Sequence, residues 1–429
     1  MKKNWKYLAY FSAIVLGCSM AACTEEKEEL NTMDINGAIH LNGYITKDSV
    51  LKDLGLDVDY IIDDQVTVEN QAKLTIEAGV TIAFAQKGGY LQCSDNGAIS
   101  MEGTKEKGIV FHGPTLNSPN GSWGYIGYFT DRPENKMSYV SLLHGGSEKE
   151  QGVLRIESEG SVSVKNCLID GSLGNGVYNV FADNALTAFE NNTITNVEKS
   201  PLLLQSFKFL KNIADNNSYT NNKINCITFD FYANSIDEKI IFNDLGYDYL
   251  FNEDFTIEGD GRMIVNENVT MKFGNGKGIW IPSGLIQING TEEKPVTLTG
   301  YKNEAGYWRG IIFESDTQNQ GGSYMKNCII SNAADKEGED NSALYIHTAY
   351  TDGVKMISLE NVKFENILNY ALTVLWDRDR NEVEGLKMPA NVTFENCGHN
   401  VMVDLNYALN MTDPYFFDSL DAIEIPEEE

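Results

Sequence analysis

The sequence predicts an all-β protein, a right-handed parallel β-helix (a solenoid) built from two tandem copies of a long multi-coil unit. Three observations predict this fold. Apolar and polar residues alternate with the period of strands after residue 35, without a long helical period. A short motif centred on asparagine returns about every 25 residues. A much longer pattern returns once, roughly 187 residues further along.

Composition sets the limits of the interpretation. Of the 429 residues 42% are hydrophobic, which is enough to fill a sizeable core. The formal net charge is -29, and the first 22 residues contribute three lysines and no acid, so the remainder carries -29 - 3 = -32. A surface this acidic repels phosphate backbones, so nucleic acid is not expected as a partner.

The first 22 residues have the pattern of a lipoprotein signal peptide. A basic start, Met1–Lys6, precedes an apolar run, Tyr7–Gly17, which is too short to span a bilayer. The small residues Ala21 and Ala22 then lead into Cys23, which resembles a bacterial lipobox. We therefore predict lipidation at Cys23. Cys18 is the alternative, but Leu16 before it fits a small-residue cleavage pocket less well than alanine.

Residues 23–35 form an acidic tether. The acids directly after Cys23 resemble the surface-export signal of Bacteroidetes lipoproteins, and an ordinary solvated tether is the alternative. Stable anchoring requires more than one acyl chain, as lipoproteins carry. The resemblance implies a protein anchored by lipid in the outer membrane, at the cell surface, with the membrane as a partner through the anchor.

The remaining cysteines are five in number and widely spaced, which does not form a disulfide framework. No CxxC pair or Cys/His cluster at zinc spacing is present, so no metal or cofactor is expected.

The asparagine motif reads apolar, Lys or Glu, Asn, any, any, apolar. We find it at Val164–Ile169, Phe189–Ile194, Met325–Ile330 and Leu359–Phe364, and in degenerate form at Phe394–His399. Asn166, Asn191 and Asn216 are 25 residues apart, and Asn327, Asn361 and Asn396 are 34 and 35 apart. The longer steps coincide with polar insertions at 334–341 and 377–387.

A stacked coil explains this motif. The asparagine would lie at a bend, where its amide bonds to backbone and to the equivalent asparagine of the next coil. A cysteine after it would fill space between coils as a small apolar residue. The alternative is a β-sandwich with chance placement of asparagine, but a sandwich would not keep one residue type at one bend.

The long repeat divides the chain into residues 36–224 and residues 225–410. The paired segments are Leu74–Phe84 with Met263–Phe273, Gly97–Thr104 with Gly284–Thr291, Val110–Gly113 with Thr297–Gly300, Trp123 and Ile126 with Trp308 and Ile311, and Tyr60–Asp63 with Tyr249–Asn252. Residues 411–429 are predicted to be a C-terminal cap and acidic tail, because an open solenoid end exposes a strand edge.

These motifs, "LTIEAGVTIAF" followed by "GAISMEGT", then "WGYIGYF" or "WRGIIFE" and asparagine-rich coils, resemble right-handed β-helix proteins of Bacteroidetes cell surfaces. The resemblance covers about residues 36–410. It implies a fold and secretion to the cell surface, but it does not imply a particular reaction. The copies depart from one another at Asn268, which replaces a turn glycine, and at Gly124-Tyr125, which stands against Arg309-Gly310.

Few residues in the sequence suggest a catalytic or ligand-binding site. Residues 376–384 place Asp377, Asp379 and Asn381 at alternating positions beside a tryptophan, as in a calcium or glycan site. Two arginines offset that charge, and the glycine comes later than an EF-hand loop requires. We interpret this segment and Asp335–Asp340 as solvated insertions, and the aspartates at 57, 59, 63 and 64 as edge charges.

The five histidines are scattered, at 40, 112, 144, 347 and 399, and form no catalytic arrangement. Trp123 and Trp308 occupy equivalent positions, which favours packing over ligand stacking. No catalytic residue is assigned. The sequence favours a non-enzymatic surface protein that binds a glycan or another protein along its solenoid face. The alternative is a carbohydrate-active enzyme of the β-helix type, either a polysaccharide lyase or a glycoside hydrolase.

Overall fold

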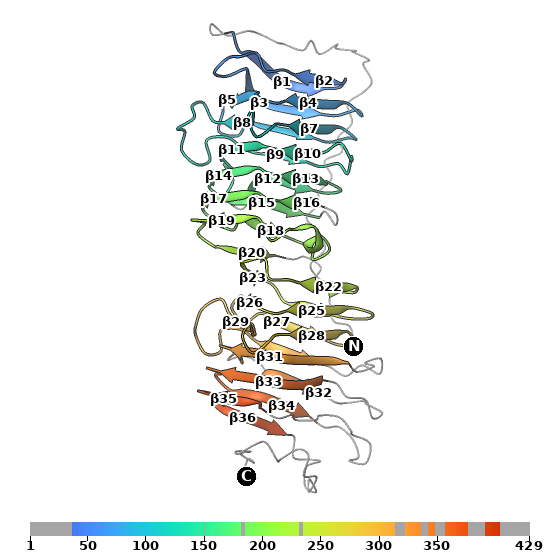
Figure 1. Cartoon of the computed structure of the whole chain (residues 1–429), viewed down its shortest axis with the longest axis vertical. Coiled ribbons are helices and arrows are strands. Elements are labelled where there is room, and N and C mark those ends of the chain that lie inside the picture. Colours follow the sequence, from blue (N-terminus) through green and yellow to red (C-terminus); the bar gives the residue numbers. More distant parts are fainter. Residues whose placement is uncertain are drawn as a thin grey trace, which may run out of the picture.

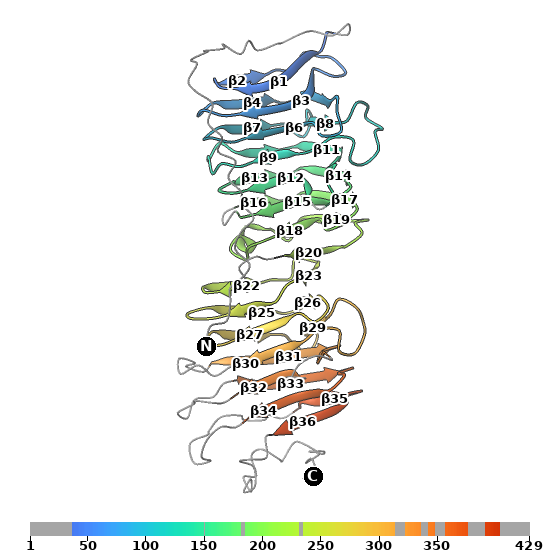
Figure 2. The ribbon, with the colours of Figure 1, turned by 180° about the vertical axis from the view of Figure 1, so that it is seen from behind.

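A computed structural model of the chain shows a parallel β-solenoid of about 12 turns, with coils stacked in chain order along one axis (Figures 1 and 2). The structure describes residues 37–149, 151–181, 185–230, 235–313, 322–335, 342–347, 357–375 and 391–403. Within these ranges the one helix is the short 3-10 turn η1 (Leu210–Asn212). The predicted all-β class is confirmed, and the solenoid is consistent with a right-handed parallel β-helix.

Each coil contributes strands to three faces, which we call faces 1, 2 and 3 in chain order. Face 1 holds β1 (Ile39–Ile45), β3 (Tyr60–Val68), β5 (Thr81–Phe84), β8 (Ile109–His112), β11 (Val140–Gly145), β14 (Leu168–Ser172), β17 (Thr193–Val197) and β19 (Ser218–Thr220). A further column holds β22 (Lys239–Phe242), β25 (Arg262–Asn266), β28 (Leu285–Asn289), β31 (Ser323–Ser331) and β33 (Ile357–Glu365), and it begins where β22 contacts η1.

Strands β1, β3, β31 and β33 continue around a corner onto face 2, which joins the two faces into one 23-stranded sheet. Face 2 also holds β6 (Tyr90–Cys93), β9 (Ile126–Tyr128), β12 (Gly152–Glu157), β15 (Asn175–Val180), β18 (Leu202–Leu204), β20 (Cys226–Phe229), β23 (Asp248–Phe251), β26 (Thr270–Phe273), β29 (Val296–Gly300) and β35 (Thr393–Glu395).

Face 3 consists of a six-stranded and a seven-stranded sheet. The first contains β2 (Ser49–Leu51), β4 (Lys73–Glu77), β7 (Ala98–Glu102), β10 (Lys136–Ser138), β13 (Val162–Lys165) and β16 (Leu186–Glu190). The second contains β21 (Ser235–Ile236), β24 (Phe255–Ile257), β27 (Gly278–Ile281), β30 (Gly310–Phe313), β32 (Ser342–His347), β34 (Tyr370–Leu375) and β36 (His399–Val403).

The core is a column of apolar side chains inside these faces. Alternation along each strand sends every second residue inward, so Ile82, Phe111 and Leu142 stack from coil to coil with no exposed surface. Full burial of such a side chain contributes about 1.5–3 kcal/mol. Because each coil pairs in register with the next, one coil's apolar residue is covered by its neighbour's.

The asparagine column lies at a bend, as the sequence predicted. Asn166 and Asn191 have positive φ values of 57° and 55°, a left-handed conformation that asparagine tolerates. The Asn191 side-chain amide donates to Oδ1 of Asn166, and its backbone N–H donates to Oδ1 of Asn216 at 2.8 Å. The three residues therefore occupy successive coils of one ladder.

A second, buried ladder runs beside the first. Asn192 Oδ1 accepts from the backbone N–H of Cys167 at 2.9 Å, and its Nδ2 donates to the carbonyl of Val164 at 3.0 Å. Asn217 repeats this role one coil later, because its Oδ1 accepts from the N–H of Asn192 at 2.9 Å. The bend thus satisfies backbone groups that would otherwise be buried without partners.

The ladder corrects one prediction. Asn361 donates to Asn327 at 3.0 Å, but the next member is Asn391, which donates to Asn361 at 2.9 Å. Phe364 pairs with Phe394, so Asn396 lies at the following bend, in register with Asn366. The degenerate motif at Phe394–His399 was therefore aligned five residues out of register.

The two copies make equivalent contacts. Trp123 stacks on Phe84 with centroids 4.3 Å apart and donates from its indole to a backbone carbonyl at 2.8 Å. Trp308 stacks on Phe273 at 4.2 Å and donates in the same way at 2.8 Å. Both tryptophans are fully buried, which confirms the packing role predicted from their symmetric placement.

The pairing columns nevertheless shift between the two copies. In the first copy β5 lies on face 1, whereas its counterpart β26 lies in the column of face 2. The column of β26 continues through β23, β20, β18 and β15 to β12 and β9. Equivalent strands of the two copies therefore lie in different columns at this point.

The exact boundaries at residues 36, 224 and 410 stay predictions. The signal segment and tether (1–35) and the cap and tail (411–429) lie outside the described residues.

The buried ladder leads to a stability prediction. Replacing Asn192 by Ala leaves the buried N–H of Cys167 and the carbonyl of Val164 without their hydrogen-bond partner. An unsatisfied buried group costs about 1–3 kcal/mol. We expect the free energy of unfolding, measured by chemical denaturation, to fall by about 2–4 kcal/mol in total. Asn191→Gly is the control, because it keeps the positive φ and removes an exposed amide, at a cost under about 1 kcal/mol. Equal losses for both variants would contradict the role of the buried ladder.

Candidate functional site

Several residues singled out by the sequence lie outside the described part of the chain. These are Cys18, Cys23, the acidic insertion at 376–384, and all of the second insertion except Asp335. Nothing in the structure bears on them.

The cysteines beyond the signal region are free thiols. Burial raises the pKa of Cys167 to about 12 and of Cys226 to about 11, so neither is a ready nucleophile. Among the described residues no group of three or more His, Cys, Asp or Glu side chains could hold a metal ion.

The early aspartates are structural, and one differs from the prediction. Asp59 is fully buried, not an edge charge, and its carboxylate accepts from the backbone N–H groups of Leu54 and Thr81 at 2.9 and 2.8 Å. Asp63 lies 2.7 Å from Nδ1 of His40. These contacts stabilise the first corner of the solenoid, where the chain turns before β3.

The most distinctive surface feature lies on face 2 of the first copy. Tyr90 on β6 and Tyr125 just before β9 stack with ring centroids 4.8 Å apart and planes 10° apart. The guanidinium carbon of Arg155 on β12 lies 4.2 Å from the centroid of the Tyr125 ring. We call Tyr90, Tyr125 and Arg155 the ladder strip. Its members come from three successive coils.

Alternation explains why the strip faces outward. Leu91, Ile126 and Leu154 point into the core, so their neighbours in sequence point out. Gly127 is paired with Arg155 and leaves the strip room, because a Cβ there would lie 3.0 Å from the Tyr125 ring.

Polar groups accompany the rings. The Tyr125 hydroxyl donates to Oε1 of Gln92 at 2.9 Å, and the Tyr90 hydroxyl donates to Oε1 of Gln65. Arg155 is paired with Glu157. Burial raises the pKa of Tyr125 to about 12, so its hydroxyl stays protonated. The strip therefore offers ring edges, amides and hydroxyls on a rigid plane, and no free acid-and-base pair.

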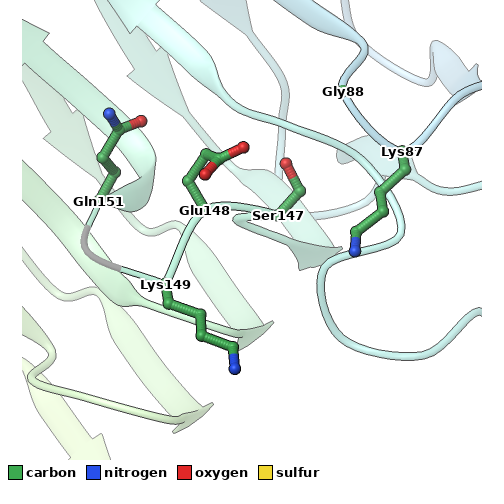
Figure 3. Close-up of a pocket in the computed structure, with 6 residues that line it drawn as sticks. All are labelled: Lys87, Gly88, Ser147, Glu148, Lys149 and Gln151. Atoms are coloured by element: carbon green, nitrogen blue, oxygen red, sulfur yellow. The ribbon is translucent and has the colours of Figure 1, made fainter.

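A hollow of about 670 Å³ adjoins the strip at the corner between faces 1 and 2. It lies between the loop after β5, with Lys87 and Gly88, and the loop after β11, with Ser147, Glu148, Lys149 and Gln151. Figure 3 shows Lys87 and Lys149 entering from opposite loops. The same loops lead directly into β6 and β12, which carry Tyr90 and Arg155.

The comparisons with known proteins agree with this architecture. The family model described as a pectate-lyase like beta helix domain matches residues 43–151, about a quarter of the chain. The matched stretch includes all the residues that line the hollow and both tyrosines of the strip. The comparison with curated proteins found no match, and the comparison with solved structures found none either. Within the described part of the chain, no helix is long and apolar enough to cross a membrane.

Sequence reasoning missed both the strip and the hollow. The signal was present, since the two copies disagree where Gly124-Tyr125 stands against Arg309-Gly310. From the sequence alone it was no more than a departure between the two copies. It is instead the point where one copy presents an aromatic ring and the other does not.

The histidines form no catalytic group among the described residues. His399 stacks on Tyr370 at 4.6 Å and is half-buried. His112 is buried, and its Nε2 has no hydrogen-bond partner in the described structure. The side chain of His347 is outside the described residues.

Burial lowers the pKa of His112 below its ordinary value of 6.5. The unfolded chain therefore takes up a proton near pH 6.5 that the native protein does not, so stability falls as pH drops below that value. We expect His112→Gln to flatten the loss in free energy of unfolding between pH 7.5 and 5.5. Denaturation curves at several pH values measure this, and parallel pH dependences for the two proteins would contradict it.

Proposed function

We propose that this β-helix protein is anchored by lipid at the outer cell surface and binds a carbohydrate chain across the ladder strip, without catalysing its cleavage. The observation that carries the proposal is the stack of Tyr90, Tyr125 and Arg155 across three coils, beside an open hollow. Rigid aromatic residues with polar tips suit recognition of sugars, whose rings have apolar faces and hydroxyl edges.

The periodicity of the scaffold supports an extended ligand. Parallel strands repeat about every 4.7–4.9 Å, so the strip presents a regular series of contacts along the solenoid axis. The likeness of residues 43–151 to a pectate-lyase like domain is consistent with a carbohydrate ligand. That likeness also favours the second candidate, a carbohydrate-active enzyme, so binding and turnover are measured together.

The absence of catalysis in the proposal rests on the chemistry of the strip. A lyase needs a base beside an acidified sugar proton, and a hydrolase needs two carboxylates facing one bond. Around the strip, Glu157 is engaged by Arg155, and Glu102 is held by Lys136 on a different face. The strip itself therefore provides contacts for binding, whereas Glu148, Lys87 and Lys149 line the adjoining hollow.

Anchoring rests on the pattern before Cys23. The small residues there and the acids that follow support lipidation and display at the surface. The acidic character of the chain as a whole makes nucleic acid an unfavourable partner.

Binding depends on the strip, so we expect Tyr125→Ala to weaken carbohydrate binding at least tenfold. The measurement uses the full-length protein in detergent, a polysaccharide array, and detection of released sugars. Trp280→Ala is the matched control, because Trp280 is an exposed aromatic on the corresponding face of the second copy. Release of products would favour the enzyme, and equal effects of both variants would overturn the strip as the site.

Lipidation has its own test. Metabolic labelling of cells with an alkyne fatty acid should label the wild-type protein and the Cys18→Ser variant, whereas Cys23→Ser should remain unlabelled. Expression levels of the three proteins serve as the control. Labelling of Cys23→Ser but not of Cys18→Ser would move the anchor to Cys18.

A further inference from the structure

The duplication provides an internal comparison for the hollow. Equivalent backbone hydrogen bonds align the two corners: the N–H of Gly124 donates to the carbonyl of Gly89 at 2.8 Å, and that of Arg309 donates to the carbonyl of Lys277 at 2.9 Å. Gly89 and Gly124 in the first copy thus correspond to Lys277 and Arg309 in the second. By the same alignment, Ser147 corresponds to Asp335.

In the second copy this corner is filled by the chain's own ion pairs. Arg309 lies 3.4 Å from Asp254 and 3.8 Å from Asp335, measured between guanidinium nitrogen and carboxylate oxygen. Lys277 pairs with Glu253 at 2.5 Å. Both of these described cations, Lys277 and Arg309, therefore have a carboxylate supplied from within the protein.

In the first copy the corner is open. Two glycines stand where the second copy has Lys277 and Arg309, and the cations are supplied instead by the Lys87 and Lys149 loops. Neither lysine makes an ion pair within the part of the chain that the structure describes. Among the described residues that line the hollow, Glu148 is the one acid and Lys87 and Lys149 are the cations.

We propose that the hollow takes a carboxylate or sulfate group of the bound carbohydrate chain, with Lys87 and Lys149 as its cations. The ligand's anion then occupies the place that Asp335 holds in the second copy. This inference rests on the proposed function and names the ligand class. The acidic remainder of the molecule repels polyanions, which confines such a ligand to this corner.

The test compares neutral and anionic forms of the same polymers. Full-length protein in detergent is immobilised, and binding of hydroxyethyl cellulose, carboxymethyl cellulose, dextran and dextran sulfate is measured. We expect at least one anionic polymer to bind tenfold or more tightly than its neutral counterpart. Lys87→Gln and Lys149→Gln should each reduce that preference severalfold, whereas Lys277→Gln, the matched control in the second copy, should leave it unchanged.

A substitution that introduces the second copy's residue into the first copy gives an additional test. Ser147→Asp introduces the carboxylate that Asp335 provides there, so we expect it to abolish the preference for the anionic polymer. Ser147→Asn, of nearly the same shape but neutral, should retain it. Thermal melting of each variant confirms that the solenoid is intact.

The outcomes separate the two proposals. Equal binding of neutral and anionic polymers, lost in Tyr125→Ala but not in the lysine variants, would overturn this inference and leave the strip as the binding site. Binding of none of the four polymers would count against both. A preference for the anionic polymer that survives both Lys87→Gln and Lys149→Gln would place the anion elsewhere and refute the assignment.

Discussion

Pairing between successive coils is the constraint on which the rest of this structure depends. A strand of one coil finds its backbone partners only in the coils before and after it, so each position along the chain must suit the position about one coil away. Apolar residues meet apolar residues inside, and asparagine meets asparagine at a bend in successive coils of each copy. The left-handed backbone at that bend explains why asparagine recurs there more than any other residue.

The two halves of the sequence repeat share their buried contacts and differ at their exposed corners. Their strands also fall into different pairing columns, as β5 and β26 do. The buried contacts remained the same, as the two tryptophans show. The exposed corners diverged: one became a hollow lined by lysines, and the other is closed by Arg309 and its carboxylate partners.

Much of the architecture was predictable because it follows from local periodicity of the sequence. The coil length, the bend asparagine and the buried tryptophans follow from alternation and repetition. The ladder strip was not predictable in the same way, since alternation indicates that Tyr90 and Tyr125 point outward but not that they stack. The misaligned motif at Asn396 has a similar cause, because a coil of irregular length shifts the register without changing the motif.

The sequence by itself determined the parallel β-solenoid, its duplication and the inward side of its strands, because these properties repeat along the chain and each repeat reports the same neighbours. Only the tertiary structure decided which outward residues meet, where the hollow lies and into which column the strands of the second copy fall. Those features depend on the number of residues between coils and on the path of each loop. Small differences in either bring different side chains together, and no local pattern records them.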